Sequence, residues 1–285
     1  MDDIKINWYP GHMAKAHRMI RENLKLVDVV IELLDARVPL SSANPMIDSV
    51  AENKPRIVAL NKADLAEAFW TEKWISRFRS KGLQAIAIEA VSGKGAKTLV
   101  AKVEEAAREK IEKQRAKGIN PRAVRAMILG IPNVGKSSLI NRLLGSTAVR
   151  TADKPGVTRG KQWIKIGRNL ELLDTPGVLW PKFEDPDVGF KLAVTGAIND
   201  EVYDLEKVMA QFLQLLRINY SSRLIDRYKL TTPLPEDSFE LLSEIGAKRG
   251  FLRSGGVIDT EKTIRIILNE FRNGKLGPFT LDQFD

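Results

Sequence analysis

One stretch of eight residues limits the fold more than any other part of the chain. Residues 130–137 read Gly-Ile-Pro-Asn-Val-Gly-Lys-Ser and match the phosphate-binding pattern G-x-x-x-x-G-K-[ST] in full. An apolar run at 126–130 precedes the loop and a helical pattern follows it, which is the context the motif requires. Such a loop directs backbone N–H groups at phosphate oxygens and adds the positive end of a helix dipole. We therefore expect an α/β domain that binds a nucleotide.

Apolar runs along the chain predict six β-strands. They lie at residues 27–34, 56–60, 85–88, 126–130, 163–166 and 170–173. Four of them lack alternation, which is typical of parallel strands covered on both faces. The turn Gly167-Arg168-Asn169 predicts that the last two strands form an antiparallel hairpin. A helical pattern at 97–117, with Leu99, Val103 and Ile111 on its apolar face, completes a three-layer α/β domain with a six-stranded, mostly parallel sheet.

The pattern changes after residue 185, where strand signals end. Asp259 is expected to cap a helix that Gly274 ends. Two other helical faces are expected from apolar residues at helical spacing: Leu205, Val208, Met209, Phe212 and Leu216 in one, and Phe239, Leu242 and Ile245 in the other. We divide the chain into a nucleotide-binding domain at 1–185, in which segment 1–26 precedes the first strand, and an all-helical domain at 186–285.

Composition excludes several classes of site. The chain has no cysteine and two histidines, which excludes a disulfide scaffold, a thiolate zinc site and a cysteine nucleophile. Its start lacks a secretory pattern, and its best apolar stretch is far shorter than the about twenty residues of a membrane span, so we expect a cytoplasmic protein.

The net charge of +9 is uneven. Residues 186–285 hold 13 basic and 15 acidic side chains, so the excess lies in the first 185 residues. A basic surface points to a polyanion such as RNA or an anionic membrane. A merely solvated, lysine-rich surface is the alternative.

The phosphate-binding loop carries most of the expected chemistry. Lys136 would reach the β- and γ-phosphates, and the Ser137 hydroxyl would bind Mg²⁺. Asp174-Thr-Pro-Gly177 follows a strand, so Asp174 can hold Mg²⁺ through a water and the Gly177 N–H can meet the γ-phosphate; a plain tight turn is the alternative. Thr158 lies in a Gly- and Pro-containing basic loop, where a switch threonine would reach Mg²⁺. The expected nucleotide contacts of the loop itself are Asn133, Val134, Gly135, Lys136, Ser137 and Ser138.

A second motif indicates which base is bound. Asn61-Lys62-Ala63-Asp64 follows a strand, and an Asp carboxylate there accepts two hydrogen bonds that guanine offers and adenine does not. Glu89 and Ala90 follow the next strand, and Ala90 would supply a backbone contact to guanine O6. Taken alone, the sequence of residues 61–64 is common in loops of many proteins. Beside a phosphate-binding loop, it indicates that the bound nucleotide is GTP.

These motifs form the GTPase set in an unusual order. The guanine motifs come first, and the phosphate-binding loop and Asp174-Thr-Pro-Gly177 follow, so the strands can pair as usual only if the domain is circularly permuted. The helical domain then begins shortly after Gly177. We hypothesise that the nucleotide state sets the docking of residues 186–285.

The combination NWYPGHMAKA, DARVP, NKADL, GIPNVGKSSLINRL, PGVTRG and DTPGVLWP resembles the circularly permuted ribosome-assembly GTPases, the YlqF-like group. The resemblance implies GTP hydrolysis in large-subunit assembly, with 23S ribosomal RNA and subunit proteins as partners, no membrane partner, a monomeric chain and an RNA-binding helical tail. A guanine-nucleotide-binding RNA scaffold with little hydrolysis, a GTPase acting on another structured RNA and an ATP-using enzyme are the alternatives.

Two positions depart from familiar GTPases. Val178 and Leu179 stand where a water-orienting Gln is common, and the resemblance suggests that His12 replaces it, so the expected catalytic residues are His12, Lys136 and Thr158. The alternative for His12 is that it caps a helix or binds an RNA phosphate. Asn133 resembles the asparagine of GTPases in which K⁺ bridges the phosphates, although an asparagine there also suits a left-handed turn. Asp35 and Arg37 end a strand and are expected to pair and fix a loop.

Overall fold

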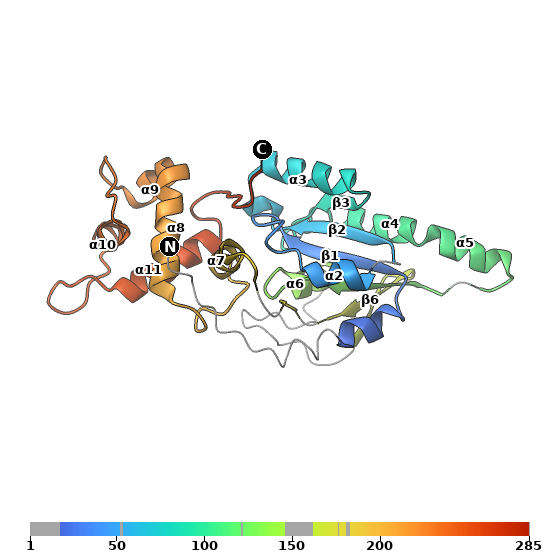
Figure 1. The fold of residues 1–285 in the computed structure, drawn as a ribbon. Coiled ribbons are helices and arrows are strands. Elements are labelled where there is room, and N and C mark those ends of the chain that lie inside the picture. Colours follow the sequence, from blue (N-terminus) through green and yellow to red (C-terminus); the bar gives the residue numbers. More distant parts are fainter. Residues whose placement is uncertain are drawn as a thin grey trace. The chain divides into compact units, whose positions relative to one another are not determined.

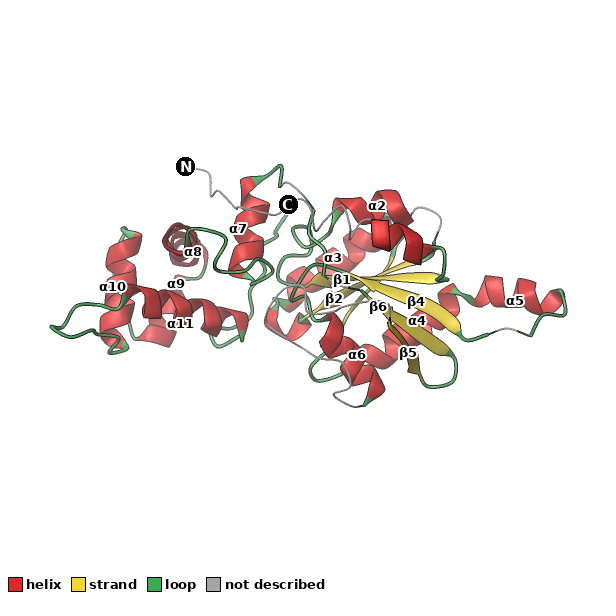
Figure 2. Ribbon diagram, turned by 90° about the horizontal axis from the view of Figure 1, so that it is seen from below, coloured by secondary structure: helices red, strands yellow, loops and turns green. Residues whose placement is uncertain are grey.

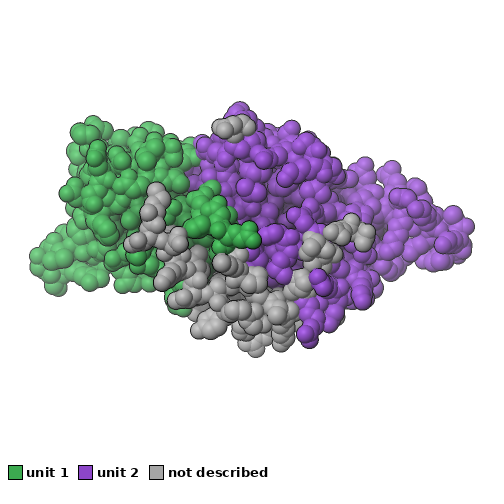
Figure 3. Space-filling view, in the orientation of Figure 1, with its two compact units in different colours: residues 1–7, 183–278 green, residues 8–182, 279–285 purple. Residues whose placement is uncertain are grey.

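The computed structural model describes residues 18–51, 54–120, 122–145, 162–175, 177–180 and 183–284. These residues divide into two compact units (Figure 3). The nucleotide unit contains the described residues up to 180 together with 279–284, and the helical unit contains 183–278. The division differs from the one expected from sequence at the end of the chain, because 279–284 belong with the sheet.

A six-stranded sheet forms the centre of the nucleotide unit (Figure 1). Its order is β3-β2-β1-β4-β6-β5, and all neighbours are parallel except β5 and β6. The predicted mostly parallel sheet with one antiparallel edge is confirmed, with strand ends shifted by one or two residues. The strands are β1 (Val29–Asp35), β2 (Arg56–Asn61), β3 (Gln84–Ala87), β4 (Val124–Leu129), β5 (Gln162–Ile166) and β6 (Leu170–Asp174).

Helices cover both faces of this sheet. Val30 and Leu34 point to one face of β1, where α2 (Pro45–Ala51) and α3 (Ala68–Ser80) pack. The opposite face carries α4 (Ala96–Ala106) and α6 (Lys136–Leu144), as Figure 2 shows. Because β1 is covered on both faces, all seven of its residues are buried, which explains why its sequence lacks polar alternation.

The prediction of a single helix over residues 97–117 is wrong. The chain forms α4 and then α5 (Arg108–Ala116), which meet at Ala107. The apolar stripe of α4 ends at Val103, and α5 buries no residue, so Ile111 does not lie in the core. α5 extends past the end of the sheet (Figures 1 and 2), which explains why its apolar residues are not buried.

The helical unit consists of α7 (Pro186–Val194), α8 (Leu205–Asn219), α9 (Ser221–Tyr228), α10 (Ser238–Lys248) and α11 (Thr260–Arg272). An aspartate caps the start of four of them, because Asp185, Asp204, Asp237 and Asp259 each accept a hydrogen bond from a first-turn N–H. The predicted cap at Asp259 is confirmed, and α11 ends two residues before Gly274.

The core of the helical unit follows the predicted apolar faces with one correction. Phe212 of α8 and Phe271 of α11 stack edge to face with ring centroids 4.9 Å apart. Leu242 and Ile245 of α10 are buried, but Phe239 is 51% exposed, so its expected place on the buried face is wrong. The buried face of α10 instead includes Ser238 and Leu241, which lie four residues before Leu242 and Ile245.

Within the described residues, no helix is both long and apolar enough to cross a membrane.

Glu32 is an exception inside the apolar core of the sheet. It lies near the middle of β1, and its Oε2 is 3.4 Å from a guanidinium nitrogen of Arg56. Burial raises the pKa of Glu32 to about 7 from an ordinary value of 4.5, and the Arg56 charge offsets only part of this rise.

We expect Glu32→Gln to change how stability depends on pH. The folded-state pKa lies above the unfolded one, so the wild-type free energy of unfolding falls between pH 4.5 and about 7 because of this carboxyl. The glutamine variant lacks that fall, and its stability relative to wild type should be higher at pH 8 than at pH 5. Denaturant unfolding of both proteins at the two pH values measures this, and equal differences would contradict it.

Candidate active site

The five parallel strands bring the sequence motifs to one edge of the sheet. Asp35, Asn61 and Asp174 are the last residues of β1, β2 and β6, and Gly130 follows β4. Because these strands are parallel, their carboxyl ends meet at the same edge. The strand order reverses between β1 and β4, which is where ligands bind in open α/β sheets.

The phosphate-binding loop turns sharply between β4 and α6. Asn133 and Gly135 have φ angles of 55° and 102°, in the left-handed region. A Cβ added at Gly130 would lie 2.6 Å from the Leu33 carbonyl oxygen, and one added at Gly135 would lie 2.3 Å from Asn61 Nδ2. Glycine is therefore required at both positions, at Gly130 by the Leu33 backbone and at Gly135 by the Asn61 side chain and the left-handed φ.

Lys136 is the first residue of α6 and is buried beneath this loop. Its Nζ donates hydrogen bonds to the carbonyl oxygens of Gly130 (3.0 Å) and Ile131 (2.7 Å). Burial lowers the pKa of Lys136 to about 8, and the Asp174 carboxylate acts in the opposite direction. The ammonium is thus held inside the loop, where anionic phosphate oxygens would replace the neutral carbonyls as its partners.

Asn61 joins the guanine motif to the phosphate-binding loop. Its Nδ2 donates to the Val134 carbonyl oxygen at 2.7 Å, across 73 residues of sequence. Its Oδ1 accepts from the Ala90 N–H at 2.9 Å. One buried amide therefore connects the segments that the sequence assigned to the base and to the phosphates. The expected contact of Ala90 with guanine O6 stays a prediction, and it would share the N–H that bonds to Asn61.

Lys62 is held by an ion pair that the sequence indicated only in part. Arg37 binds Asp35 through two parallel hydrogen bonds of 2.9 and 2.7 Å, which confirms the expected pair. Lys62 Nζ also lies 2.9 Å from Asp35 Oδ2. Burial raises the pKa of Asp35, but the Arg37 and Lys62 charges outweigh it and hold that pKa well below its ordinary range. No sequence spacing linked Asp35 to Lys62, since β1 and β2 become neighbours only in the sheet.

The remaining guanine-motif residues lie in two short loops. Ala63 and Asp64 belong to the single-turn helix η1 (Ala63–Leu65), and Asp64 is exposed at this edge. Glu89 does not reach the other motifs in the contacts seen: its carboxylate accepts from the Ser92 hydroxyl at 2.7 Å and pairs with Lys94. The Ser92 hydrogen bond, with Lys94, lowers the pKa of Glu89. Glu89 therefore shapes its own loop.

The Asp174–Gly177 segment packs against the phosphate-binding loop. A Cβ at Gly177 would lie 2.6 Å from Pro132 Cα and 3.0 Å from Lys136 Nζ. The Val178 N–H donates to the Gly130 carbonyl oxygen at 3.2 Å. These contacts put Gly177 beside the lysine expected to reach the γ-phosphate.

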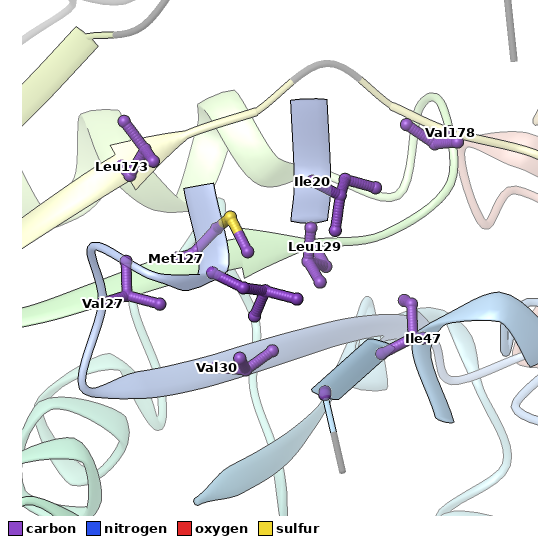
Figure 4. Close-up of a cluster of buried hydrophobic side chains, with 10 residues drawn as sticks. Ile20, Val27, Val30, Ile47, Met127, Leu129, Leu173 and Val178 are labelled. Atoms are coloured by element: carbon purple, nitrogen blue, oxygen red, sulfur yellow. The ribbon is translucent and has the colours of Figure 1, made fainter. Parts of the chain in front are cut away.

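The side chain after this segment cannot orient a water molecule. Val178 belongs to a buried apolar cluster that includes Ile20, Ile47 and Leu129 (Figure 4). Leu179 is also buried. These two side chains therefore cannot position the attacking water. His12, the residue expected there, lies outside the described residues.

The oxygen donors expected to bind Mg²⁺ fit a hard cation. Ser137 is the second residue of α6, directly after Lys136, and the Asp174 carboxylate is buried at the end of β6. Thr158 lies outside the described residues, among which no cluster of three or more His, Asp or Glu could hold a metal. The left-handed φ of Asn133 accounts for an asparagine without any ion, so K⁺ binding there stays a prediction.

The chain is similar over nearly its whole length to proteins that share one family name. A family model described as 50S ribosome-binding GTPase matches residues 125–247. Proteins named ribosome biogenesis GTPase A from Priestia megaterium and Bacillus cereus are 52% and 53% identical to the chain. These alignments cover 97% of this chain, and 96% and 93% of the two relatives. The chain belongs to the ribosome biogenesis GTPase A family.

Solved structures agree with this family. A GDP-bound YlqF is 26% identical, covers 93% of this chain and 99% of its own, and has a TM-score of 0.67. A GNP-bound YlqF from T. maritima is 27% identical, with coverages of 94% and 98% and a TM-score of 0.66. As a member of this family the chain is a GTP hydrolase with a circularly permuted domain, as its motif order predicted.

We expect Gly135→Ala to weaken nucleotide binding strongly. The new Cβ would strain a φ of 102° and displace the Asn61 amide from Val134, which leaves buried polar groups unpaired at a cost of about 1–3 kcal/mol each. GDP affinity should fall at least ~100-fold, measured by titration with a fluorescent analogue.

Gly145→Ala is the matched control at the other end of α6. It has a φ of 68° but open space around its Cβ position. It should lose about 1–2 kcal/mol of stability, the cost of a left-handed alanine, and keep GDP affinity. Equal binding losses in the two variants would contradict the role given to the Asn61 contact.

Proposed function

We propose that this GTPase acts in the cytoplasm in assembly of the large ribosomal subunit, with 23S ribosomal RNA and subunit proteins as partners. The observation that carries the proposal is the match of residues 125–247 to a model described as 50S ribosome-binding, since 50S denotes the large subunit. The names of the relatives and the basic excess of the first 185 residues support it, because ribosomal RNA is a polyanion.

In this proposal the described residues bind the two ends of GTP. Backbone N–H groups of residues 133–138 and the Lys136 ammonium bind the phosphates, and the Asp64 carboxylate accepts hydrogen bonds from guanine. Ser137, Thr158 and, through a water, Asp174 would hold Mg²⁺, which would neutralise charge on the phosphates. Asn133 would be the ligand of a K⁺ ion that adds further positive charge.

The reaction is in-line attack of water on the γ-phosphorus. The water oxygen bonds to phosphorus, the bond to the β–γ bridging oxygen breaks, and GDP and phosphate leave. We assign the positioning of this water to His12, as the resemblance to the YlqF-like group implies; the buried Val178 and Leu179 offer no polar group at the usual place. Gly177 would sense the γ-phosphate through its N–H.

Asp64→Asn should change the base that the protein binds. An asparagine leaves guanine N2–H₂ without its acceptor but can donate to the oxygen of xanthine at that position, so GTP affinity should fall at least ~100-fold while xanthosine triphosphate binds. Competition titrations with both nucleotides measure this. Asp226→Asn in α9 is the control and should bind GTP as wild type does; unchanged GTP preference in Asp64→Asn would contradict the assignment of residues 61–64.

Large subunits should accelerate GTP hydrolysis by the wild-type protein. In single-turnover assays we expect stimulation by purified large subunits and not by small ones, and we expect His12→Ala to bind GTP with wild-type affinity and to lose the stimulation. No turnover under any condition would favour the scaffold alternative. Full stimulation of His12→Ala would exclude His12 as the residue that positions water.

A further inference from the structure

Residues 279–284, called here the return segment, leave the helical unit and pack on the nucleotide unit. In Figure 1 they form the end of the chain beside α3. Phe279, Thr280 and Asp282 are buried although the segment has no helix or strand. Nothing in the proposed function uses these residues, and their burial requires an explanation.

The first contact of the return segment is with the loop that carries Asp64. The Phe279 N–H donates to the Leu65 carbonyl oxygen at 2.9 Å. The Glu67 N–H donates to Thr280 Oγ1 at 3.2 Å, and the Thr280 N–H donates back to Glu67 Oε2 at 3.3 Å. Three hydrogen bonds thus fix the end of residues 61–67, one to three residues beyond the expected guanine-binding carboxylate.

The second contact is with the loop that follows β1. The Leu281 N–H donates to the Arg37 carbonyl oxygen at 2.7 Å. The Ser41 N–H and hydroxyl donate to the two carboxylate oxygens of Asp282, at 2.7 and 2.8 Å. Arg37 is the residue whose guanidinium pairs with Asp35, the partner of Lys62. Through Arg37 and Asp35, the return segment therefore also supports Lys62 at the start of the guanine motif.

The third contact anchors the segment to α3. Trp74 Nε1–H donates to the Asp282 carbonyl oxygen at 2.8 Å, and the Trp74 and Phe284 rings pack edge to face at 4.8 Å. The Arg77 guanidinium lies 4.3 Å from the Phe284 ring centroid. This anchor gives the segment a fixed position from which to hold the two loops.

We propose that the return segment is a positioning element for guanine recognition: by docking on residues 37–41 and 65–67 it holds Lys62 and Asp64 in their binding positions. The inference rests on the assignment of residues 61–64 to the base. Because the same loop arrangement serves both events, docking of the segment and binding of guanine nucleotide favour each other. Such coupling is reciprocal, so each must strengthen the other by the same factor.

Deletion of residues 279–285 tests the proposal in one direction. We expect the GDP dissociation constant to rise about 5- to 100-fold, the range of common coupling energies, while kcat at saturating GTP stays near the wild-type value because the phosphate-binding loop keeps its own supports. A lower melting temperature with unchanged GDP affinity would mean that the segment is only structural, and would overturn the proposal.

A point variant guards against a deletion that fails to fold. Thr280→Val keeps the shape of the side chain but removes the hydroxyl that accepts from Glu67, and should raise KM and the GDP dissociation constant about fivefold without lowering kcat. Thr231→Val makes the same change in the helical unit, where the hydroxyl bonds to Glu244, and should change neither value. Equal GDP affinity in wild type and Thr280→Val would count against the proposal.

Hydrogen exchange tests the reverse direction on the unmodified protein. Saturating GDP should slow hydrogen exchange in the peptide that contains the Phe279 and Leu281 amides. The exchange rate should fall by the same factor by which the deletion raises the GDP dissociation constant. Unchanged exchange would overturn the coupling. Wild-type GDP binding and the Asp64→Asn swap test the assignment of the base loop separately, so failure of that assignment is distinguishable from failure of the coupling.

Discussion

The site depends on the buried side-chain amide of Asn61. It donates to Val134 in the phosphate-binding loop and accepts from Ala90 in the loop after β3, so both of its polar ends are used. A lost partner would leave a buried polar group unpaired, which costs more than the bond itself contributes. The amide thus joins the segments expected to bind the base and the phosphates. Circular permutation leaves this contact intact, because the contact depends on the order of strands in the sheet and is independent of the order of segments along the chain.

A second support is the buried charge cluster at the end of β1. Asp35 lies between the cations of Arg37 and Lys62, and two positive partners compensate for the desolvation of one carboxylate. The cluster fixes Lys62, which has a left-handed φ of 60° and starts the turn that presents Asp64. The return segment bonds to the backbone of Arg37 and to Leu65. The expected guanine loop is thus supported at its start by ion pairs and at its end by backbone hydrogen bonds.

Chain connectivity joins the helical unit to both functional ends of the site. Residue 183 follows shortly after Gly177, which packs on the phosphate-binding loop, and residue 278 leads directly into the return segment. In an unpermuted GTPase the segment after Asp-Thr-Pro-Gly would continue within the same sheet. Permutation places a second unit at this point, which is the arrangement that nucleotide-dependent docking of the helical unit would need.

The sequence by itself determined the sheet, the phosphate-binding loop and the base motif, because each is encoded by short contiguous patterns: apolar runs, glycines at fixed spacing, and Asn-Lys-Ala-Asp after a strand. It also determined that Val178 could not orient water. The sequence did not show that α5 separates from α4 at Ala107, that Phe239 is exposed, or that residues 279–284 leave the helical unit. These outcomes depend on which surfaces pack against another segment of the folded chain. The pairing of Asp35 with Lys62 depends on such packing as well. Local patterns specify an element and its apolar face, whereas contacts between segments distant in sequence exist only once the sheet has brought them together.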